Sequence, residues 1–179
     1  MLTSSFSAVN QEPMTSPTSP YLVADTVEPG IPEGYKRLEA GGPYFRQMGP
    51  VYTRRNSDGQ TAILALRVAA SHLNIQGVTH GGMLTTLADA ALGINLALAR
   101  GRRGGQVTVS LTADFLSGAR EGDWLEAHVV ITRMGKRLAY ANCDLKVGDR
   151  HVLRSSAVFA IVDRPLPQGA GQLPPLQDG

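Results

Sequence analysis

Two hydrophobic periods divide the central part of the chain. Over residues 83–99, apolar side chains recur every three or four positions, in two rows that together cover most of a helix surface. The rows consist of Met83, Leu87, Ala91, Ile94 and Leu98, and of Leu84, Ala88, Leu92 and Leu96. A helix that is apolar nearly all round is a buried helix. The pattern therefore predicts one buried helix, which ends near Gly101, a residue type common just after helices.

Strand-like segments lie on both sides of this helix. Residues 61–69 are apolar and rich in strand-forming residues, and a polar loop over 71–79 follows them. After the helix, apolar and polar residues alternate in four runs, at 107–115, 125–132, 139–147 and 151–162. Short turns join the last three runs, which is typical of antiparallel pairing. We therefore predict an α+β fold in which a long antiparallel sheet wraps around one central buried helix.

The two ends of the chain differ from its centre in composition. Residues 1–20 contain five Ser, three Thr and three Pro, and residues 164–179 contain four Pro. Such segments bury too little apolar surface to offset the entropy lost on ordering. We therefore divide the chain into a flexible N-terminal tail (1–30), a lead-in segment (31–49), one domain (50–163) and a Pro/Gly-rich C-terminal tail (164–179).

The charged fraction of the chain is low. Asp, Glu, Lys and Arg make up 18% of the 179 residues, whereas about 25% is typical of soluble domains. This low fraction suggests that part of the surface is buried against another subunit. The net charge of +2 is too small for a nucleic-acid-binding surface, and no recognition motif for nucleic acid is present.

Targeting and redox features are few. The first basic residue is Lys36, so no secretory signal is recognisable near the N-terminus. The most apolar stretch, 84–99, contains Asp89 and Asn95 and is shorter than the ~20 residues that span a bilayer. The single cysteine, Cys143, excludes an internal disulfide and fits a small core residue in a strand. We therefore expect a cytoplasmic protein.

Two features of the helix region indicate chemistry. Asp89 lies within the apolar helix, and burying an ionised carboxylate is costly unless it is paired or used. His80, Gly81 and Gly82 come directly before the helix, where free N–H groups and the helix dipole favour a negative charge. Each signal is weak alone, but together they outline an acidic residue and an oxyanion hole.

The same residues resemble a family signature. The run from His72 to Gly82, followed by Leu87 to Gly93, resembles the motif of hotdog-fold acyl-CoA thioesterases, in particular the PaaI-like branch. In that pattern an Asn precedes the His-Gly-Gly by six positions and an Asp follows the His by nine, and this chain keeps both spacings. The resemblance covers roughly residues 50–162, and it implies hydrolysis of an acyl- or aryl-CoA to the free acid and CoA.

The resemblance also implies roles for individual residues. Asp89 corresponds to the catalytic carboxylate, which acts as the nucleophile or as the general base for water. The Gly81 N–H corresponds to the donor that polarises the thioester carbonyl, Asn74 to the amide that positions water or substrate, and His80 to a support of the same loop. Thr108 occupies the place of a water-orienting hydroxyl, although it also fits a plain polar strand face.

Helix geometry adds an inference that is independent of the resemblance. Gly81 and Asp89 are eight residues apart, which corresponds to about 12 Å along a helix. A thioester needs the oxyanion donor and the nucleophile within about 3–3.5 Å of its carbonyl. One copy of the helix cannot supply both, whereas two antiparallel copies can. We therefore expect an active site shared between the subunits of a homodimer or of a dimer of dimers.

Basic residues are candidates for contacts with the phosphates of CoA. Arg133, Lys136 and Arg137 surround a hairpin turn, and Arg120 follows the strand that contains Phe115. Arginine binds phosphate through paired hydrogen bonds, although these cations also fit a solvated hairpin tip. We expect the remaining histidines, His72, His128 and His151, to be structural, and we expect no metal and no cofactor beyond the CoA of the substrate.

Two alternatives use the same fold. A hotdog hydratase or dehydratase would carry Asp and His together after a strand, a motif that we do not find. A non-catalytic acyl-CoA sensor would need an output element such as a DNA-binding helix pair, and residues 1–50 have no such pattern. A free-thiol assay over a panel of acyl-CoAs distinguishes these hypotheses, because a sensor binds without turnover. The acyl group itself is not determined by the sequence.

Overall fold

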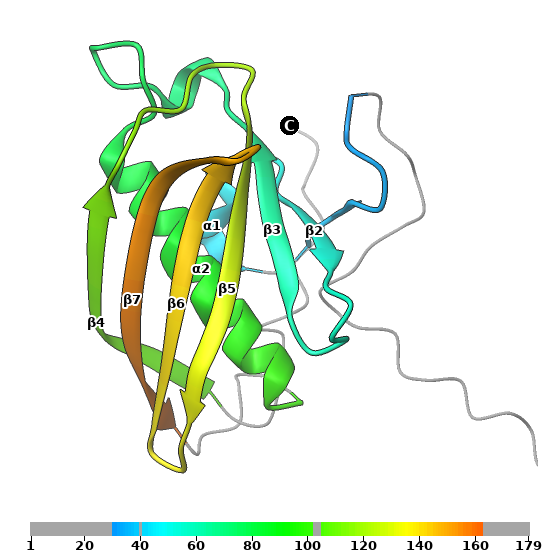
Figure 1. Cartoon of the computed structure of the whole chain (residues 1–179), viewed down its shortest axis with the longest axis vertical. Helices are drawn as coiled ribbons and strands as arrows, with labels where there is room; N and C mark the ends of the chain where they lie inside the picture. Colours follow the sequence, from blue (N-terminus) through cyan, green and yellow to red (C-terminus); the bar gives the residue numbers. More distant parts are fainter. Residues whose placement is uncertain (1–29, 40, 102–104, 163–179) are drawn as a thin grey trace, which may run out of the picture.

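One helix lies across a single antiparallel sheet in the computed structural model, which describes residues 30–39, 41–101 and 105–162 (Figure 1). The helices are α1 (Pro43–Arg46) and α2 (Gly81–Ala99), and a 3₁₀ turn spans Ala70–His72. The strands are β1 (Lys36–Arg37), β2 (Tyr52–Arg55), β3 (Ala62–Arg67), β4 (Gly105–Phe115), β5 (Trp124–Met134), β6 (Leu138–Val147) and β7 (Arg150–Val162). Their order in the sheet is β1-β2-β3-β5-β6-β7-β4, with every neighbouring pair antiparallel. The predicted sheet around one helix is confirmed.

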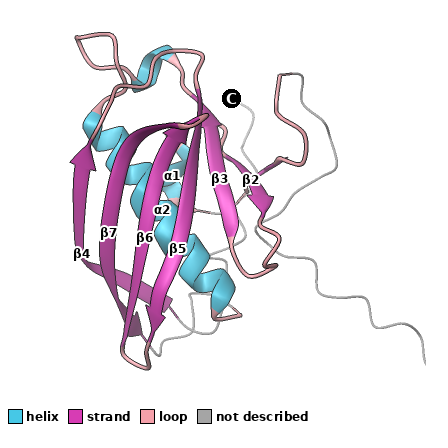
Figure 2. Cartoon of the chain, in the orientation of Figure 1, coloured by secondary structure: helices cyan, strands magenta, loops and turns pink. Residues whose placement is uncertain are grey.

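The long strands curve around α2, as Figure 2 shows. Leu87, Leu92 and Leu96 on α2 are fully buried against the sheet. By length and hydropathy alone α2 could cross a membrane, but its packing is that of a core helix. The expectation of burial nearly all round is corrected on one side, because Asp89, Ala90 and Gly93 are only half-buried. The sheet covers one side of the helix and leaves that other side accessible.

Asn95 fixes α2 against the sheet. Its side chain is fully buried, its Oδ1 accepts a hydrogen bond from the Ala62 N–H (2.7 Å), and its Nδ2 donates to the Ala62 carbonyl (3.0 Å). A buried amide without partners would be strongly destabilising. The paired contacts therefore fix the rotation of α2 about its axis, and with it the direction in which Asp89 points.

The lead-in segment packs against the outer face of the sheet and then against α2. Tyr35 packs edge-on against Trp124 and donates a 2.5 Å hydrogen bond to Glu126 Oε1 on the outer face of the sheet. Burial, together with this bond to a carboxylate, raises the pKa of Tyr35. The segment then continues into α1, which lies beside α2. Of the expected tails, residues 1–29 and 164–179 lie outside the described residues.

The strand β4 is long and lies at one edge of the sheet. It spans 11 residues and pairs with β7, and within the described chain its other edge pairs with no strand. Val107 and Val109 on this strand are more than half exposed. A long, exposed apolar edge is a template for pairing with another chain.

The single cysteine lies in the core. Cys143 is buried in β6, where burial raises the pKa of its thiol to about 12. The expectation of a core cysteine is confirmed.

Candidate active site

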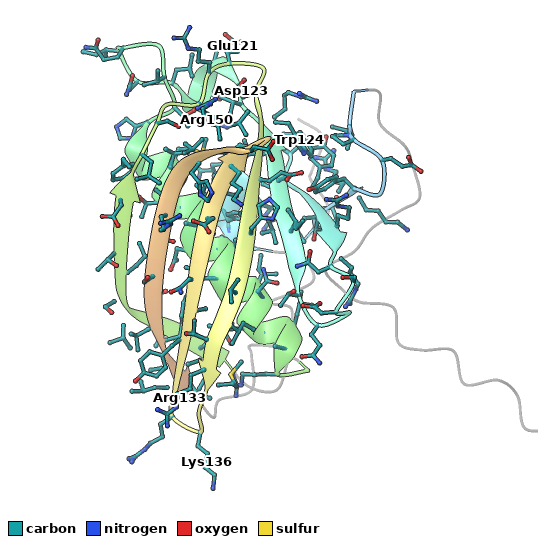
Figure 3. All side chains as sticks on the ribbon, in the orientation of Figure 1. Glu121, Asp123, Trp124, Arg133, Lys136 and Arg150 are labelled. Atoms are coloured by element: carbon teal, nitrogen blue, oxygen red, sulfur yellow. The ribbon has the colours of Figure 1, made fainter. Side chains whose placement is uncertain are left out.

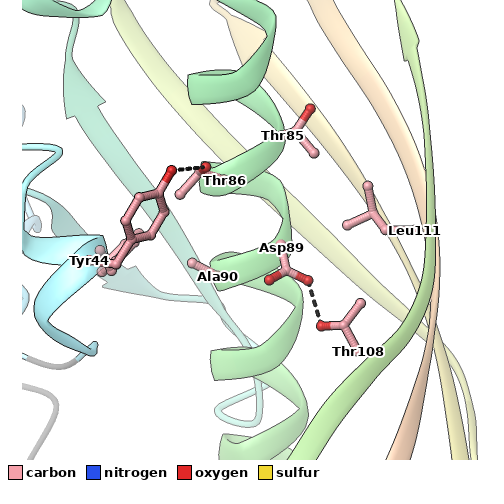
Figure 4. A pocket seen from close by; sticks show the side chains of 8 residues that line it. Tyr44, Thr85, Thr86, Asp89, Ala90, Thr108 and Leu111 are labelled. Carbon is pink, nitrogen blue, oxygen red and sulfur yellow. Dashed lines mark hydrogen bonds between the residues drawn. The ribbon is translucent and has the colours of Figure 1, made fainter.

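Asp89 and Thr108 meet across the contact between α2 and β4. Thr108 Oγ1 donates a 2.7 Å hydrogen bond to Asp89 Oδ1 (Figure 4). The register of β4 against β7 shifts between Thr108 and Ser110, and such an irregularity re-aims the side chains beside it. Thr108 thus faces Asp89 on the helix. The carboxylate is held in place yet stays accessible, as a base or nucleophile must be.

Two pockets adjoin Asp89 and share it as part of their walls. The first, of about 380 Å³, lies between α1 and β4 and is lined by Tyr44, Phe45, Thr85, Thr86, Asp89, Ala90, Thr108 and Leu111. The second, of about 260 Å³, lies toward the C-terminal half of α2 and is lined by Gly41, Gly42, Phe45, Asp89, Ala90, Gly93, Ile94, Gln106, Thr108 and Phe159. The carboxylate therefore lies where the two pockets meet, so it could reach a reacting bond in the middle of a substrate that occupies both pockets.

The N-terminus of α2 is built from backbone groups. His80 is the N-cap, and its Nδ1 accepts a 2.9 Å hydrogen bond from the Gly82 N–H. Within the described chain, the Gly81 N–H has no acceptor. A Cβ at Gly81 would lie 3.0 Å from the Phe115 ring, so the glycine lets this ring close over the helix end. The arrangement leaves one N–H available for an oxyanion.

Asn74 shapes the loop before this helix. Its Oδ1 accepts hydrogen bonds from the N–H groups of Gln76 (2.8 Å) and Val78 (3.4 Å). Asn74 also lines a third pocket of about 360 Å³, together with Val78, Thr79, Gly81, Leu84, Phe115, Leu116, Ser117 and Gly118. The structure therefore brings Asn74 and Gly81 to one pocket. The side-chain oxygen of Asn74 is engaged by the loop, so its NH₂ group is the part that can meet a ligand.

The Asp89 pockets and the Gly81 pocket have no residue in common within one chain. Both residues lie on the same straight element, two turns apart, at the spacing of about 12 Å that the helix rise gives. The five candidate residues thus form two half-sites rather than one site: Asp89 with Thr108, and Gly81 with His80 and Asn74.

The four candidate cations are not one cluster. Arg133 and Lys136 lie at the hairpin that joins β5 to β6, whereas Glu121, the neighbour of Arg120, lies at the opposite end of the sheet (Figure 3). The 11 residues of β5 separate these ends by about 35 Å. Within one chain, Arg120 and the hairpin cations (Arg133, Lys136 and Arg137) cannot contact the same phosphates.

The other histidines have structural partners. His72 is buried in the 3₁₀ turn, where its Nδ1 accepts from the Ala69 N–H and its Nε2 donates to the Met48 carbonyl at 2.8 Å. His128 bonds to Glu126, and His151 Nδ1 lies 3.3 Å from Asp144. Among the described residues, no three His, Cys, Asp or Glu side chains are grouped as metal ligands.

Sequence reasoning missed the contribution of the lead-in segment. Tyr44 and Phe45 on α1 line the pocket beside Asp89, and Tyr44 Oη lies 3.5 Å from Thr86 Oγ1. The paired glycines Gly41 and Gly42 followed by two aromatic residues were the available signal. Nothing local in that signal indicates that this segment, about 45 residues before Asp89, lies next to it.

Comparison with known proteins places this geometry in a family. The model of the thioesterase superfamily matches residues 76–153. A Pseudomonas aeruginosa protein whose name describes it as a "putative esterase" is 40% identical over 129 residues, which is 72% of this chain and 96% of that protein. Acyl-coenzyme A thioesterase 13 of Mus musculus is 33% identical over 104 residues, which is 58% of this chain and 73% of that protein.

Solved structures agree with the sequence relatives. A point mutant of the phenylacetic acid degradation protein PaaI from Thermus thermophilus has a TM-score of 0.58 and 26% identity, and the match covers 68% of this chain and all of that one. The E. coli PaaI protein has a TM-score of 0.58 at 23% identity, over 68% of this chain and 86% of that one. The resemblance inferred from the motif is therefore confirmed: this chain is similar in structure to PaaI proteins, has the hotdog fold, and belongs to the thioesterase superfamily.

Proposed function

We propose that the protein hydrolyses the thioester of an acyl-CoA to a free acid and CoA. The observation that carries this proposal is the accessible Asp89 carboxylate, held by Thr108 between two pockets, on a helix whose N-terminal Gly81 N–H is free. These are the two functions that acyl transfer to water requires: a base or nucleophile, and a donor for the oxyanion. CoA enters as part of the substrate, so the reaction uses no separate cofactor.

The chemistry follows from these groups. With Asp89 as general base, its carboxylate takes a proton from water while the water oxygen attacks the carbonyl carbon. The carbonyl oxygen becomes an oxyanion that a Gly81 N–H stabilises. The tetrahedral intermediate then collapses, the C–S bond breaks, and the thiolate of CoA takes the proton from Asp89. Direct attack by Asp89 on the carbonyl carbon would break the C–S bond, release the thiolate of CoA and give a mixed anhydride. Water would then hydrolyse this anhydride to the free acid and the Asp89 carboxylate.

The proposal includes a homodimer, because the two half-sites of one chain lie too far apart. Thr108 contacts Asp89 near the start of β4, and Phe115 covers Gly81 at its end. Two antiparallel copies of the exposed β4 edge, paired about a two-fold axis between Leu111 and Thr112, place Thr108 opposite the partner's Phe115. Asp89 of each chain then faces the helix N-terminus of the other. The free edge and exposed valines of β4 support this pairing.

Complementation between two inactive variants tests both the hydrolysis reaction and the sharing of the active site between two subunits. We expect Asp89→Ala and Asn74→Ala homodimers to be nearly inactive in a free-thiol assay with acyl-CoAs. After subunit exchange in an equal mixture, half of the dimers are heterodimers with one intact site of two, so activity returns to about a quarter of the wild-type value. Exchange is verified with differently tagged chains.

Two results would contradict the proposal in different ways. Wild-type protein that turns over no acyl-CoA, over a panel from acetyl to palmitoyl and aryl groups, would exclude the hydrolase and favour a binding module. If the wild-type protein is active and subunit exchange is verified, but the mixed variants regain no activity, the hydrolase assignment stands and the active site is not shared between subunits.

A further inference from the structure

Gly93 is an unusual residue for its position. It lies in the interior of α2, where glycine is less favourable than alanine because it gains no side-chain packing and loses more backbone entropy. A Cβ added at Gly93 would find only Phe159 Cε1 nearby, at 3.8 Å, which is ordinary contact. Neither helix stability nor crowding by the protein therefore explains the glycine. Space on the accessible side of the helix remains as the explanation.

That space is the smaller pocket beside Asp89. Gly93 lies one turn beyond Asp89 and lines the 260 Å³ pocket, as do Gly41 and Gly42 of the lead-in segment. Phe45 and Phe159, which belong to the buried core, form apolar parts of its wall. Three residues without side chains and two core aromatics make a hollow suited to an apolar group.

The polar groups of this pocket already have partners. Gln106 Nε2 donates a 2.7 Å hydrogen bond to the Gly93 carbonyl, and Thr108 donates to Asp89. An apolar ligand therefore leaves neither of these donors unsatisfied, which would otherwise oppose its binding. The larger pocket has the more apolar wall, but this wall includes Tyr44, which is 71% exposed and lies at the solvent boundary. That side leads to solvent, which the large polar part of a CoA ester must reach.

We propose that the Gly93 pocket receives the acyl group, and that Gly93 determines how large an acyl group is accepted. The inference rests on the proposed function and adds the direction in which the substrate lies across Asp89. With about 30 Å³ for each water-sized group, 260 Å³ holds roughly nine non-hydrogen atoms. The expected substrates are acyl-CoAs with compact or medium-length acyl groups, such as octanoyl, rather than long-chain esters such as palmitoyl.

A graded pair of substitutions tests this role. In Gly93→Ala and Gly93→Leu, the added side chain fills the pocket, so kcat/KM for octanoyl-CoA falls relative to that for acetyl-CoA. We expect the octanoyl-to-acetyl ratio to drop severalfold for Ala and at least about tenfold for Leu, the loss expected when a pocket rejects several methylenes. Gly93→Ala keeps the test valid if the leucine variant fails to fold, because its Cβ fits without a clash.

Matched controls separate the acyl end from the solvent side. Ala99→Leu places the same leucine side chain in the last turn of α2, outside the residues that line either Asp89 pocket, and we expect it to leave the ratio unchanged. Thr86→Leu fills the Tyr44 side of the larger pocket, and we expect it to lower turnover of both esters alike. A shifted ratio in Thr86→Leu but not in the Gly93 variants would overturn the assignment. Absence of turnover by wild-type protein would instead overturn the proposed function, and this inference with it.

Discussion

The two half-sites on α2 are constructed in opposite ways. Around Asp89 the working group is a side chain, oriented by a second side chain from β4 across a 2.7 Å hydrogen bond. At Gly81 the working group is a backbone N–H, left free where the helix begins and exposed by the absence of a side chain. One helix of 19 residues therefore carries both a candidate base and a candidate oxyanion donor, but the distance of about 12 Å between them is too long for both to act on the same carbonyl. Four substitutions test the difference between a side-chain half-site and a backbone half-site.

Asp89→Asn should have the largest effect. Asparagine keeps the shape of the side chain but cannot accept the proton of water or attack the thioester. We expect kcat to fall by about 10²–10⁴, the range attributed to general-base catalysis, while the melting temperature stays the same or rises. Asp149→Asn, which removes an exposed carboxylate from the turn between β6 and β7, is the matched control. Near-normal turnover in a folded Asp89→Asn protein would end the catalytic assignment.

Gly81 should tolerate a methyl group better than the loss of its N–H. His80 already has the extended backbone (φ −63°, ψ 133°) that a residue before proline adopts, and proline is common at the first helical position. Gly81→Pro should therefore fold and lose about 10²–10³ in kcat, as when an oxyanion donor is removed.

Gly81→Ala is the matched comparison for this loss. It requires only that the Phe115 ring, 57% exposed, move slightly, so its loss should be at least tenfold smaller. Circular dichroism confirms folding of both variants. Equal kcat values for them would show that the N–H does not contribute.

Thr108→Val should have an intermediate effect. Valine has the shape of threonine but cannot donate to Asp89, and a hydrogen bond to a charged group is worth about 1.5–3 kcal/mol. We expect kcat to fall about 10-fold to 100-fold with little change in KM, and Thr108→Ser to restore most of it. Thr132→Val on β5, away from the β4 edge, is the control, because its hydroxyl donates to the Tyr140 carbonyl at 3.0 Å instead. A change in stability alone, with normal kcat, would make Thr108 a structural residue.

The cations should have the smallest effect and show which end of the sheet receives the CoA phosphates. Exposed charge pairs contribute about 0.2–1 kcal/mol each, so Arg133→Glu with Lys136→Glu should raise KM about twofold to fivefold, without lowering kcat. Because the hairpin carries three cations, we expect a smaller increase for Arg120→Glu. Both increases should vanish at high salt. If Arg120→Glu raises KM more than the hairpin double variant does, the CoA phosphates bind at the Arg120 end of the sheet. If KM is unchanged in both variants, none of these cations contacts the phosphates.

Much of the site could be predicted because its signals are local. The spacing of Asn74, His80 and Asp89 is a property of one loop and one helix, and the distance of about 12 Å between Gly81 and Asp89 follows from the helix rise alone. The lead-in residues Tyr44 and Phe45 could not be assigned in this way. Their place beside Asp89 depends on how Tyr35 and His72 hold the segment on either side of α1, through contacts between distant parts of the chain.

The helix and the alternating strands could be predicted from the sequence, because periodicity records which side of each element is buried. The candidate site residues were predicted from a local motif in the same way. Three features required the folded structure: β4 is an edge strand among the described residues, Asn95 fixes the rotation of α2, and Arg120, between β4 and β5, is separated by the length of β5 from the hairpin cations. The folded structure also shows that Gly93 lines a pocket beside Asp89. The physical reason is that local patterns specify burial, whereas strand order and helix rotation arise from packing between segments that no local pattern connects.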